Sequence, residues 1–229
     1  MNIASNLDTR GFVIVPNVLD DSASHALASL LGDSNGAGTR DMLHNQKVAE
    51  LAESILAELV RPHLPHCPLP VRGIYFDKRP ETNWLVAWHQ DLTLALKEKA
   101  EVPGFGPWSV KEGVPHVQPP IHLLEQMLTV RLHLDDTDSS NGALRVLSGT
   151  HRLGRLNAEA IQSCRETHEE VLCEAKAGDV LLMRPLLLHA SSRSSSPRRR
   201  RVVHIEFAGF PLPAPLEWHE APCQSFKSP

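Results

Sequence analysis

The stretch Thr129–Leu134 reads TVRLHL, and its polar and apolar side chains alternate at every position. A period of two is that of a β-strand with one buried face, because successive side chains point to opposite faces of a sheet. The pair Asn141-Gly142 follows soon after and is a strong turn signal, with a second apolar run at 143–147. This region therefore predicts two short strands joined by a turn. On the first strand, one face carries Thr129, Arg131 and His133.

Strand signals recur on both sides of this region, as short β-branched or apolar runs bounded by turn residues. They lie at 11–16, 71–76, 84–94, 171–173, 179–183 and 202–207. Helical spacing occurs over 20–31, 48–60 and 157–168, and Gly32 and Pro62 end the first two of these runs. Helices first and many short strands afterwards predict a mostly β chain with flanking helices, folded as a double-sheet jelly roll. We expect one domain over 1–229, with a helical flank at about 18–62 and a jelly-roll core at about 70–208.

The segment 102–120 is rich in proline and glycine and carries no clear strand or helix pattern. An irregular loop of that length inside a compact domain is usually functional or disordered. Because Phe105, Trp108 and Lys111 lie within it, we expect an ordered lid. Lys111 has two open interpretations, a contact to an acidic group of a substrate or a solvated surface lysine.

Composition excludes several classes of protein. The chain has 229 residues, 41% hydrophobic content, a net charge of -4 and a pI of about 6.3, so nothing favours nucleic acid or an anionic membrane as a partner. No apolar run is long enough to cross a membrane. The four cysteines form no CxxC pair, which is typical of reduced thiols in a cytoplasmic protein. The sequence indicates no oligomeric state.

Two copies of a histidine–x–aspartate pattern are candidates for metal chemistry. His89 and Asp91 lie in WHQD (88–91), and His133 and Asp135 lie in RLHLDD (131–136). On a strand, this spacing places both side chains on one face. With one distant histidine, such a pair can form the 2-His-1-carboxylate facial triad of non-haem Fe(II) oxygenases. The spacing alone does not choose between the two copies.

A distant histidine and an arginine run supply the remaining parts of such a site. His189 ends the apolar run LLLHAS (186–191), and four arginines occupy 198–201 directly before a β-branched strand. A 2-oxoacid co-substrate with a far carboxylate needs a bidentate cation, which arginine supplies. The residue pattern by itself leaves open which of the four arginines would serve.

Taken together, GFVIVPNVL (11–19), WHQDL (88–92), RLHLDDTDSSNGALRVLSGTHRLG (131–154), and LLLHASS (186–192) followed by RRRRVVHIEF (198–207) resemble the phytanoyl-CoA dioxygenase family. The resemblance implies a double-stranded β-helix, a cupin-like form of jelly roll. It makes His89, Asp91 and His189 the iron ligands. It also implies co-substrate contacts from Gln90 and Ser191, and from Arg200, eleven positions after His189. Arg40 stands near where family members place a further cation, and His133 becomes an inward-facing, hydrogen-bonded strand residue.

The same resemblance implies an enzyme that uses Fe(II), 2-oxoglutarate and O2 and releases succinate and CO2. Since the carboxylate of Asp91 is present, we expect hydroxylation of an unactivated C–H bond of a small molecule rather than halogenation. The alternative is a cupin-like metal-binding protein on the same fold that is non-catalytic or reacts as an isomerase or hydrolase. The substrate itself depends on pocket shape, which the sequence does not reveal.

Overall fold

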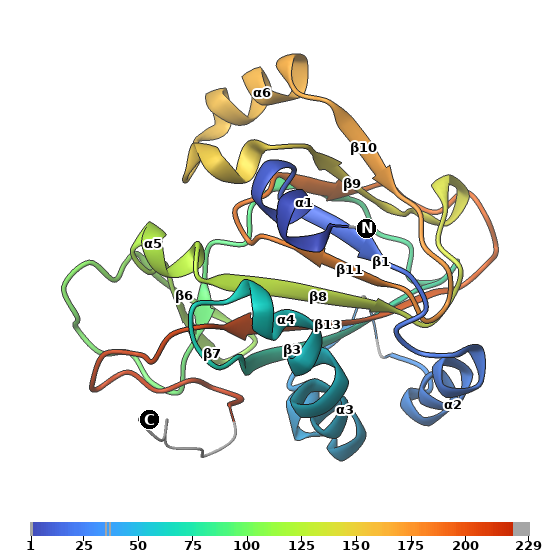
Figure 1. The fold of residues 1–229 in the computed structure, drawn as a ribbon, viewed down its shortest axis with the longest axis horizontal. Coiled ribbons are helices and arrows are strands. Elements are labelled where there is room, and N and C mark those ends of the chain that lie inside the picture. The colour runs from blue at the N-terminus through green and yellow to red at the C-terminus, as the bar shows by residue number, and fades with distance from the viewer. Residues whose placement is uncertain (1, 35, 37, 222–229) are drawn as a thin grey trace.

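The computed structural model describes residues 2–34, 36 and 38–221, and its main feature is a pair of facing antiparallel sheets, with a third, three-stranded sheet and helices around them (Figure 1). The predicted mostly β, double-sheet architecture is confirmed. The large sheet has the spatial order β1 (Phe12–Val15), β11 (Val180–Met183), β8 (Met127–His133), β13 (Arg200–Ala208), β3 (Leu69–Lys78) and β2 (Gly38–Thr39). The small sheet has the order β10 (Glu170–Cys173), β9 (Leu144–Leu147), β12 (His189–Ser191) and β4 (Val86–His89).

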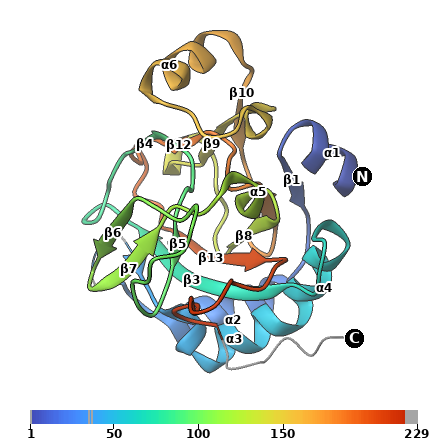
Figure 2. The same cartoon turned by 90° about the vertical axis from the view of Figure 1, so that its left-hand side faces the viewer.

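The helices of the N-terminal flank cover the outer face of the large sheet (Figure 2). Helix α2 (Asp21–Leu31) begins at Asp20, whose carboxylate accepts a hydrogen bond from the Ala23 amide, and it ends at Gly32 with a φ of 63°. The helix predicted over 48–60 is confirmed, although it passes through a π-helical turn. Its parts are α3 (Gln46–Leu51), η2 (Ala52–Leu56), α4 (Ala57–Val60) and the 3-10 turn η3 (Arg61–His63).

Strand β8 shows how the alternating sequence positions the site. Leu128, Val130 and Leu132 pack in the apolar cluster shared with the flanking helices. Their polar neighbours therefore face the interior between the two sheets, as the period of two requires. Strand β13 repeats the pattern, with Val203, Ile205 and Phe207 outward in the same cluster.

The space between the sheets is apolar at one end and polar at the other. Leu144 and Val146 of the small sheet pack there against Phe12, Leu181 and Met183 of the large sheet. Beyond this cluster the interior opens into a pocket lined largely by charged and polar side chains. The fold therefore closes one end of the jelly roll and leaves the other for a ligand.

Two expectations for the middle of the chain were wrong. The segment 102–120 is not irregular throughout, because β6 (Trp108–Lys111) and β7 (Val114–Val117) form a hairpin that pairs with β5 (Leu94–Ala95). Glu112 and Gly113 make its turn with φ values of 51° and 84°. The strand predicted over 84–94 is split into β4 and β5, because the Asp91 amide leaves the sheet and donates to the Pro185 carbonyl.

The remaining elements lie around the sheets. Helix α1 (Ile3–Thr9) was not predicted, and it buries Leu7 in the cluster beneath the large sheet. Helix α6 (Ala158–Thr167) confirms the helical pattern predicted there. None of the helices among the described residues has the length and apolar character needed to span a membrane. The short elements are η1 (Met42–His44), α5 (Ile121–Leu124), η4 (Ser139–Asn141) and η5 (Thr150–Leu153).

Candidate metal centre

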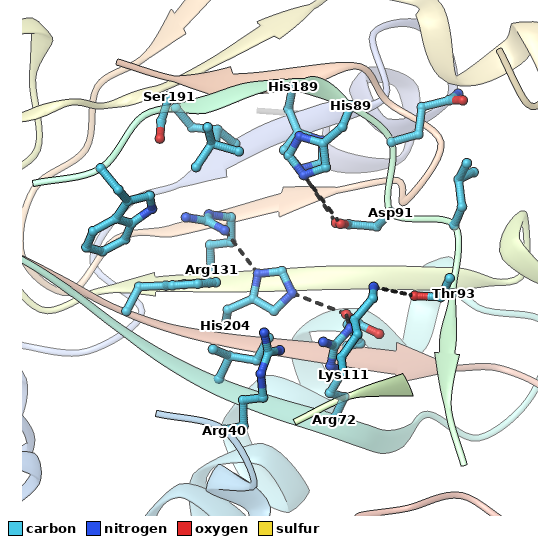
Figure 3. Close-up of a pocket in the computed structure, with 18 of the residues that line it drawn as sticks. Arg40, Arg72, His89, Asp91, Thr93, Lys111, Arg131, His189, Ser191 and His204 are labelled. Atoms are coloured by element: carbon cyan, nitrogen blue, oxygen red, sulfur yellow. Dashed lines mark hydrogen bonds and ion pairs between the residues drawn. The ribbon is translucent and has the colours of Figure 1, made fainter. Parts of the chain in front are cut away.

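Two histidines on neighbouring strands of the small sheet face each other. His89 of β4 and His189 of β12 are Cα partners in the antiparallel ladder, and their ring centroids are 4.1 Å apart. The Asp91 carboxylate reaches both rings (Figure 3), with Oδ1 3.8 Å from Nε2 of His89 and Oδ2 3.6 Å from Nε2 of His189. One ligand atom from each of the three residues lies within 4.8 Å of the others, and the described residues contain no second such cluster.

Backbone hydrogen bonds fix both imidazole rings for metal binding. Nδ1 of His89 lies 2.8 Å from the Ala87 carbonyl oxygen, and Nδ1 of His189 lies 2.9 Å from that of Leu187. Because a carbonyl oxygen only accepts, each Nδ1 carries the proton and each Nε2 presents a lone pair. Burial lowers the pKa of His189 to about 4, so its ring is neutral near pH 7. Neutral imidazoles held from behind in this way are typical metal ligands.

Asp91 is the anionic member of the cluster. Its Oδ2 is buried and has no hydrogen-bond partner among the described residues. Burial opposes ionisation, but the nearby His189, His204, His89 and Arg72 lower the pKa of Asp91 to about 2. An ionised carboxylate with a buried oxygen that has no hydrogen-bond partner is costly, and a metal cation would stabilise it. Two imidazoles and one carboxylate fit Fe(II) with positions left open.

Gln90 lies between the two ligands but points away from them. Its amide nitrogen donates to the carbonyls of Gly154 at 2.8 Å and Leu186 at 2.7 Å. Its amide oxygen accepts from the Leu156 amide at 2.9 Å. All three bonds go to backbone, so the side chain anchors the segment that carries His89 and Asp91.

The second histidine–x–aspartate pair has other partners. Nδ1 of His133 lies 3.0 Å from the Thr137 hydroxyl, and burial lowers the pKa of His133 to about 3. The Asp135 carboxylate binds the Arg201 guanidinium in bidentate fashion, at 2.6 and 2.8 Å. The expectation of a buried, hydrogen-bonded His133 is confirmed.

The triad opens into a pocket of about 300 Å³ whose inner part is cationic. Arg200 and Arg131 line it and are only 3% and 6% exposed. Arg200 donates to the Gly142 carbonyl, and Nη1 of Arg131 lies 3.0 Å from Nδ1 of His204. Burial lowers the pKa of Arg200 to about 9 and that of Arg131 to about 10. Within the described part of the chain neither guanidinium has a carboxylate partner, so this part of the pocket suits an anion.

The four consecutive arginines differ in their partners. Arg198 pairs with Asp138, Arg199 with Asp77 and Asp33, and Arg201 with Asp135. Arg200 is the member that lines the pocket. The strand alternation of β13 turns it inward, and it is the arginine that the family resemblance singles out, eleven positions after His189.

Three further residues line the pocket, namely Ser191, Arg40 and Arg131, and the sequence named the first two as candidates. Ser191 is 2% exposed and lines the pocket on the same side as Arg131 in Figure 3. Arg40 also lines it, and its Nε forms a 3.0 Å ion pair with Glu112 at the tip of the hairpin. Sequence reasoning missed Arg131 as a site residue. The available signal was its place beside His133 on the polar face of TVRLHL.

Solved structures of the same fold include iron- and 2-oxoglutarate-binding enzymes. EctD from S. alaskensis with 2-oxoglutarate and 5-hydroxyectoine aligns with a TM-score of 0.69 and 18% identity, over 95% of this chain and 82% of that one. HygX from Streptomyces hygroscopicus with nickel and 2-oxoglutarate gives 0.61 and 18%, over 88% and 84%. The non-heme alpha ketoglutarate dependent carbocyclase SnoK from nogalamycin biosynthesis gives 0.67 and 14%, over 90% and 83%. These likenesses confirm the cupin-like jelly roll.

A family model supplies the remaining evidence, since a search of curated proteins finds no match. The model described as phytanoyl-CoA dioxygenase matches residues 7–202, a range that contains the metal cluster and Arg200. Fe(II), 2-oxoglutarate and O2 are the cofactor and co-substrates that the site fits. The chain belongs to the phytanoyl-CoA dioxygenase family.

Proposed function

We propose that this Fe(II)/2-oxoglutarate-dependent enzyme hydroxylates an unactivated C–H bond of a small molecule, with release of succinate and CO2. One observation carries the proposal. An ionised Asp91 lies between two histidines, with a buried Oδ2 that has no hydrogen-bond partner among the described residues, in the same pocket as a buried arginine without a carboxylate partner. A cation and an anion are both needed to balance these charges.

His89, Asp91 and His189 would hold the iron, which when bound supplies the activation of O2 against 2-oxoglutarate. Arg200 would bind the far carboxylate of 2-oxoglutarate, because its guanidinium is buried in the pocket and has free donors. Ser191, also buried in the pocket wall, would add a hydroxyl donor. Arg131 would add a second positive charge.

Gln90 and Arg40 receive other roles in this proposal than the family resemblance implies. The amide of Gln90 is fully engaged with backbone, so we assign it to positioning the two ligands beside it. The ion pair of Arg40 with Glu112 assigns it to holding the hairpin over the pocket. The chain then acts as one catalytic domain in which the hairpin is the lid that limits the access of water.

Alternatives on the same fold differ in the reaction. SnoK is described as a carbocyclase, and SnoN, a similar structure at 18% identity, as an epimerase. The fold is therefore compatible with outcomes other than hydroxylation. A non-catalytic member would have no use for Arg200, a buried guanidinium that has no carboxylate partner among the described residues.

The test is a metabolite screen with purified protein, Fe(II), 2-oxoglutarate and isotopically labelled O2. Hydroxylation predicts substrate-dependent succinate release and one labelled oxygen atom in the product. His189→Ala is the matched control and should release no succinate above background. Succinate release with a product that carries no labelled oxygen would contradict hydroxylation and favour cyclisation or epimerisation.

A further inference from the structure

We propose that the substrate is a small acid, and that its carboxylate or phosphate group binds Lys111 and Arg72 at the outer side of the pocket. This inference rests on the proposed function, because it names the substrate class of the same site. Figure 3 shows Lys111 and Arg72 on the side of the pocket away from Ser191 and Arg131. The pocket thus has a second cationic region besides the one assigned to 2-oxoglutarate.

Lys111 carries a positive charge that the protein does not neutralise. It is the last residue of β6 and lines the pocket, and its ammonium donates only to the Thr93 hydroxyl, at 3.2 Å. Among the described residues no carboxylate lies within ion-pair distance of it. The side chain is exposed, and the desolvation that remains, together with the charges of Arg72 and Arg40, lowers the pKa of Lys111. A cation in such surroundings is stabilised when an anion binds beside it.

Glu206, the carboxylate that pairs with Arg72, is already committed. Glu206 Oε1 accepts from Nη1 of Arg72 at 3.0 Å and lies 3.5 Å from Nε2 of His204. Burial opposes the charge of Arg72, but Glu206, Asp91 and Glu220 raise its pKa, so it stays cationic. Since Glu206 balances Arg72, it does not balance Lys111 as well. Arg72 lines the pocket on the same side as Lys111 (Figure 3).

The hairpin holds Lys111 in place. Its neighbour Glu112 forms the 3.0 Å ion pair with Arg40, which comes from the segment between β2 and η1. This contact ties the hairpin tip to the N-terminal flank across the pocket. The ammonium of Lys111 is therefore positioned by its own hydrogen bond to Thr93 and by the ion pair that its neighbour Glu112 makes with Arg40.

The net charge of the pocket wall also favours an anionic substrate. Five cationic side chains line it, against two carboxylates, and the cations are Arg40, Arg72, Lys111, Arg131 and Arg200. The two positive charges of Fe(II) and the two negative charges of 2-oxoglutarate cancel. Five minus two leaves three positive charges, of which Glu112 offsets one through Arg40. A neutral or cationic substrate would leave this excess in place, whereas an anionic one reduces it.

The size of the pocket limits the acid to a small one. Its volume of about 300 Å³ lies at the lower end of the range for small-molecule sites, and it must also contain 2-oxoglutarate. A large conjugate would have to extend out of the pocket past the hairpin. We therefore expect the anionic group and the oxidised carbon to belong to one compact molecule.

The experiment uses the full chain loaded with Ni(II) and 2-oxoglutarate, so that the inner anion region is filled and no turnover occurs. Calorimetric titrations compare a panel of small carboxylic acids, a panel of phosphate monoesters, and the neutral amide or alcohol matched to each compound. Binding by members of either acidic panel, with matched neutral compounds at least about 10-fold weaker, is the expected result. The two panels identify which oxyanion is preferred.

Variants assign that binding to Lys111. In Lys111→Met the affinity for the acids should fall by about 10-fold or more, and in Lys111→Arg it should be largely retained. Lys47→Met, an exposed lysine paired with Glu50 on α3, is the control and should bind as the unmodified chain does. The affinity for 2-oxoglutarate should stay within about twofold in all three variants.

Three results would overturn the inference. These are neutral compounds that bind as well as their acids, acids that bind equally to Lys111→Met, and no acid of either panel binding to the loaded protein. Failure of the proposed function is distinguishable, because it would show as failure of 2-oxoglutarate to bind the Ni(II)-loaded protein, or as succinate release with a product that carries no labelled oxygen.

Discussion

The two histidine–x–aspartate pairs have identical spacing and opposite surroundings. His89 ends the short β4 at the edge of the small sheet, and the chain then leaves the sheet so that Asp91 faces both histidines. His133 ends β8 in the middle of the large sheet, and Asp135 beyond it is fully paired with Arg201. The first carboxylate has an unpartnered buried oxygen and the second has a bidentate arginine.

The partners of the two carboxylates, rather than the spacing in the sequence, separate a metal site from a structural ion pair. A carboxylate bound by a guanidinium contributes to stability and has little charge left for a cation. A carboxylate left unpaired beside two neutral imidazoles gains from binding one. Substitutions in the first pair and its pocket should therefore weaken cofactor binding, and a substitution in the second pair should lower stability instead.

Asp91→Asn should abolish tight Fe(II) binding. The substitution keeps the shape of the side chain but removes the negative charge between the two histidines. The loss should exceed the roughly 10–100-fold typical of removing a supporting partner of a ligand. Metal-competition titration measures it, and Fe(II) affinity within tenfold of the unmodified chain would show that Asp91 is not a ligand.

Arg200→Met should weaken 2-oxoglutarate binding by roughly 30- to 5,000-fold, because removing one partner of a buried charge pair costs about 2–5 kcal/mol. Fe(II) affinity should change little. Arg198→Met is the matched control, since Arg198 is half exposed and pairs with Asp138. Calorimetry of 2-oxoglutarate with the metal-loaded protein provides the measurement. Equal losses of 2-oxoglutarate affinity in both variants would show that Arg200 is not the residue that binds the co-substrate.

Gln90→Ala should lower Fe(II) affinity by roughly tenfold, at the lower end of the range for residues that support metal ligands. The change removes the three hydrogen bonds from the Gln90 side chain to backbone groups, which anchor the segment carrying His89 and Asp91. The affinity of the metal-loaded protein for 2-oxoglutarate should remain within about threefold, provided that Gln90 acts by positioning. A larger loss of 2-oxoglutarate than of Fe(II) affinity would instead assign Gln90 to the co-substrate.

Asp135→Asn should leave Fe(II) and 2-oxoglutarate binding unchanged and lower the free energy of unfolding by about 2 kcal/mol, the value of a charge-assisted hydrogen bond. It removes the charge from the bidentate pair with Arg201, whose two side chains are under one-fifth exposed. Denaturant unfolding of the metal-free protein measures the loss. Weakened Fe(II) binding at unchanged stability would reverse the roles of the two pairs.

The sequence predicted the double-sheet architecture and the large elements because strong periodicities carry them. TVRLHL alternates over a full strand, and the structure turns its faces as the alternation requires. The helices after Asp20 and before Pro62 have clear start or stop signals. The ligand set His89, Asp91 and His189 came from resemblance, and the structure brings the three together.

What the sequence did not predict depends on contacts between distant segments. The hairpin at 108–117 has two strands of four residues each, largely exposed in β6 and half-buried in β7, so its pairing leaves little local pattern. The residue pattern alone did not separate Arg200 from its neighbours, and only the family resemblance singled it out. In the fold, Arg198, Arg199 and Arg201 bind carboxylates. The contact of Arg40 with Glu112 likewise joins residues far apart in the chain.

The most direct test of the central claim is anaerobic titration of the metal-free protein with Fe(II) and then 2-oxoglutarate, followed by visible absorption. The account predicts a weak charge-transfer band from a chelate of 2-oxoglutarate on iron, reached at one equivalent of each. The band should persist in Asp135→Asn and be absent in Asp91→Asn. A band that survives in Asp91→Asn and disappears in Asp135→Asn would contradict the assignment of the metal centre to β4 and β12.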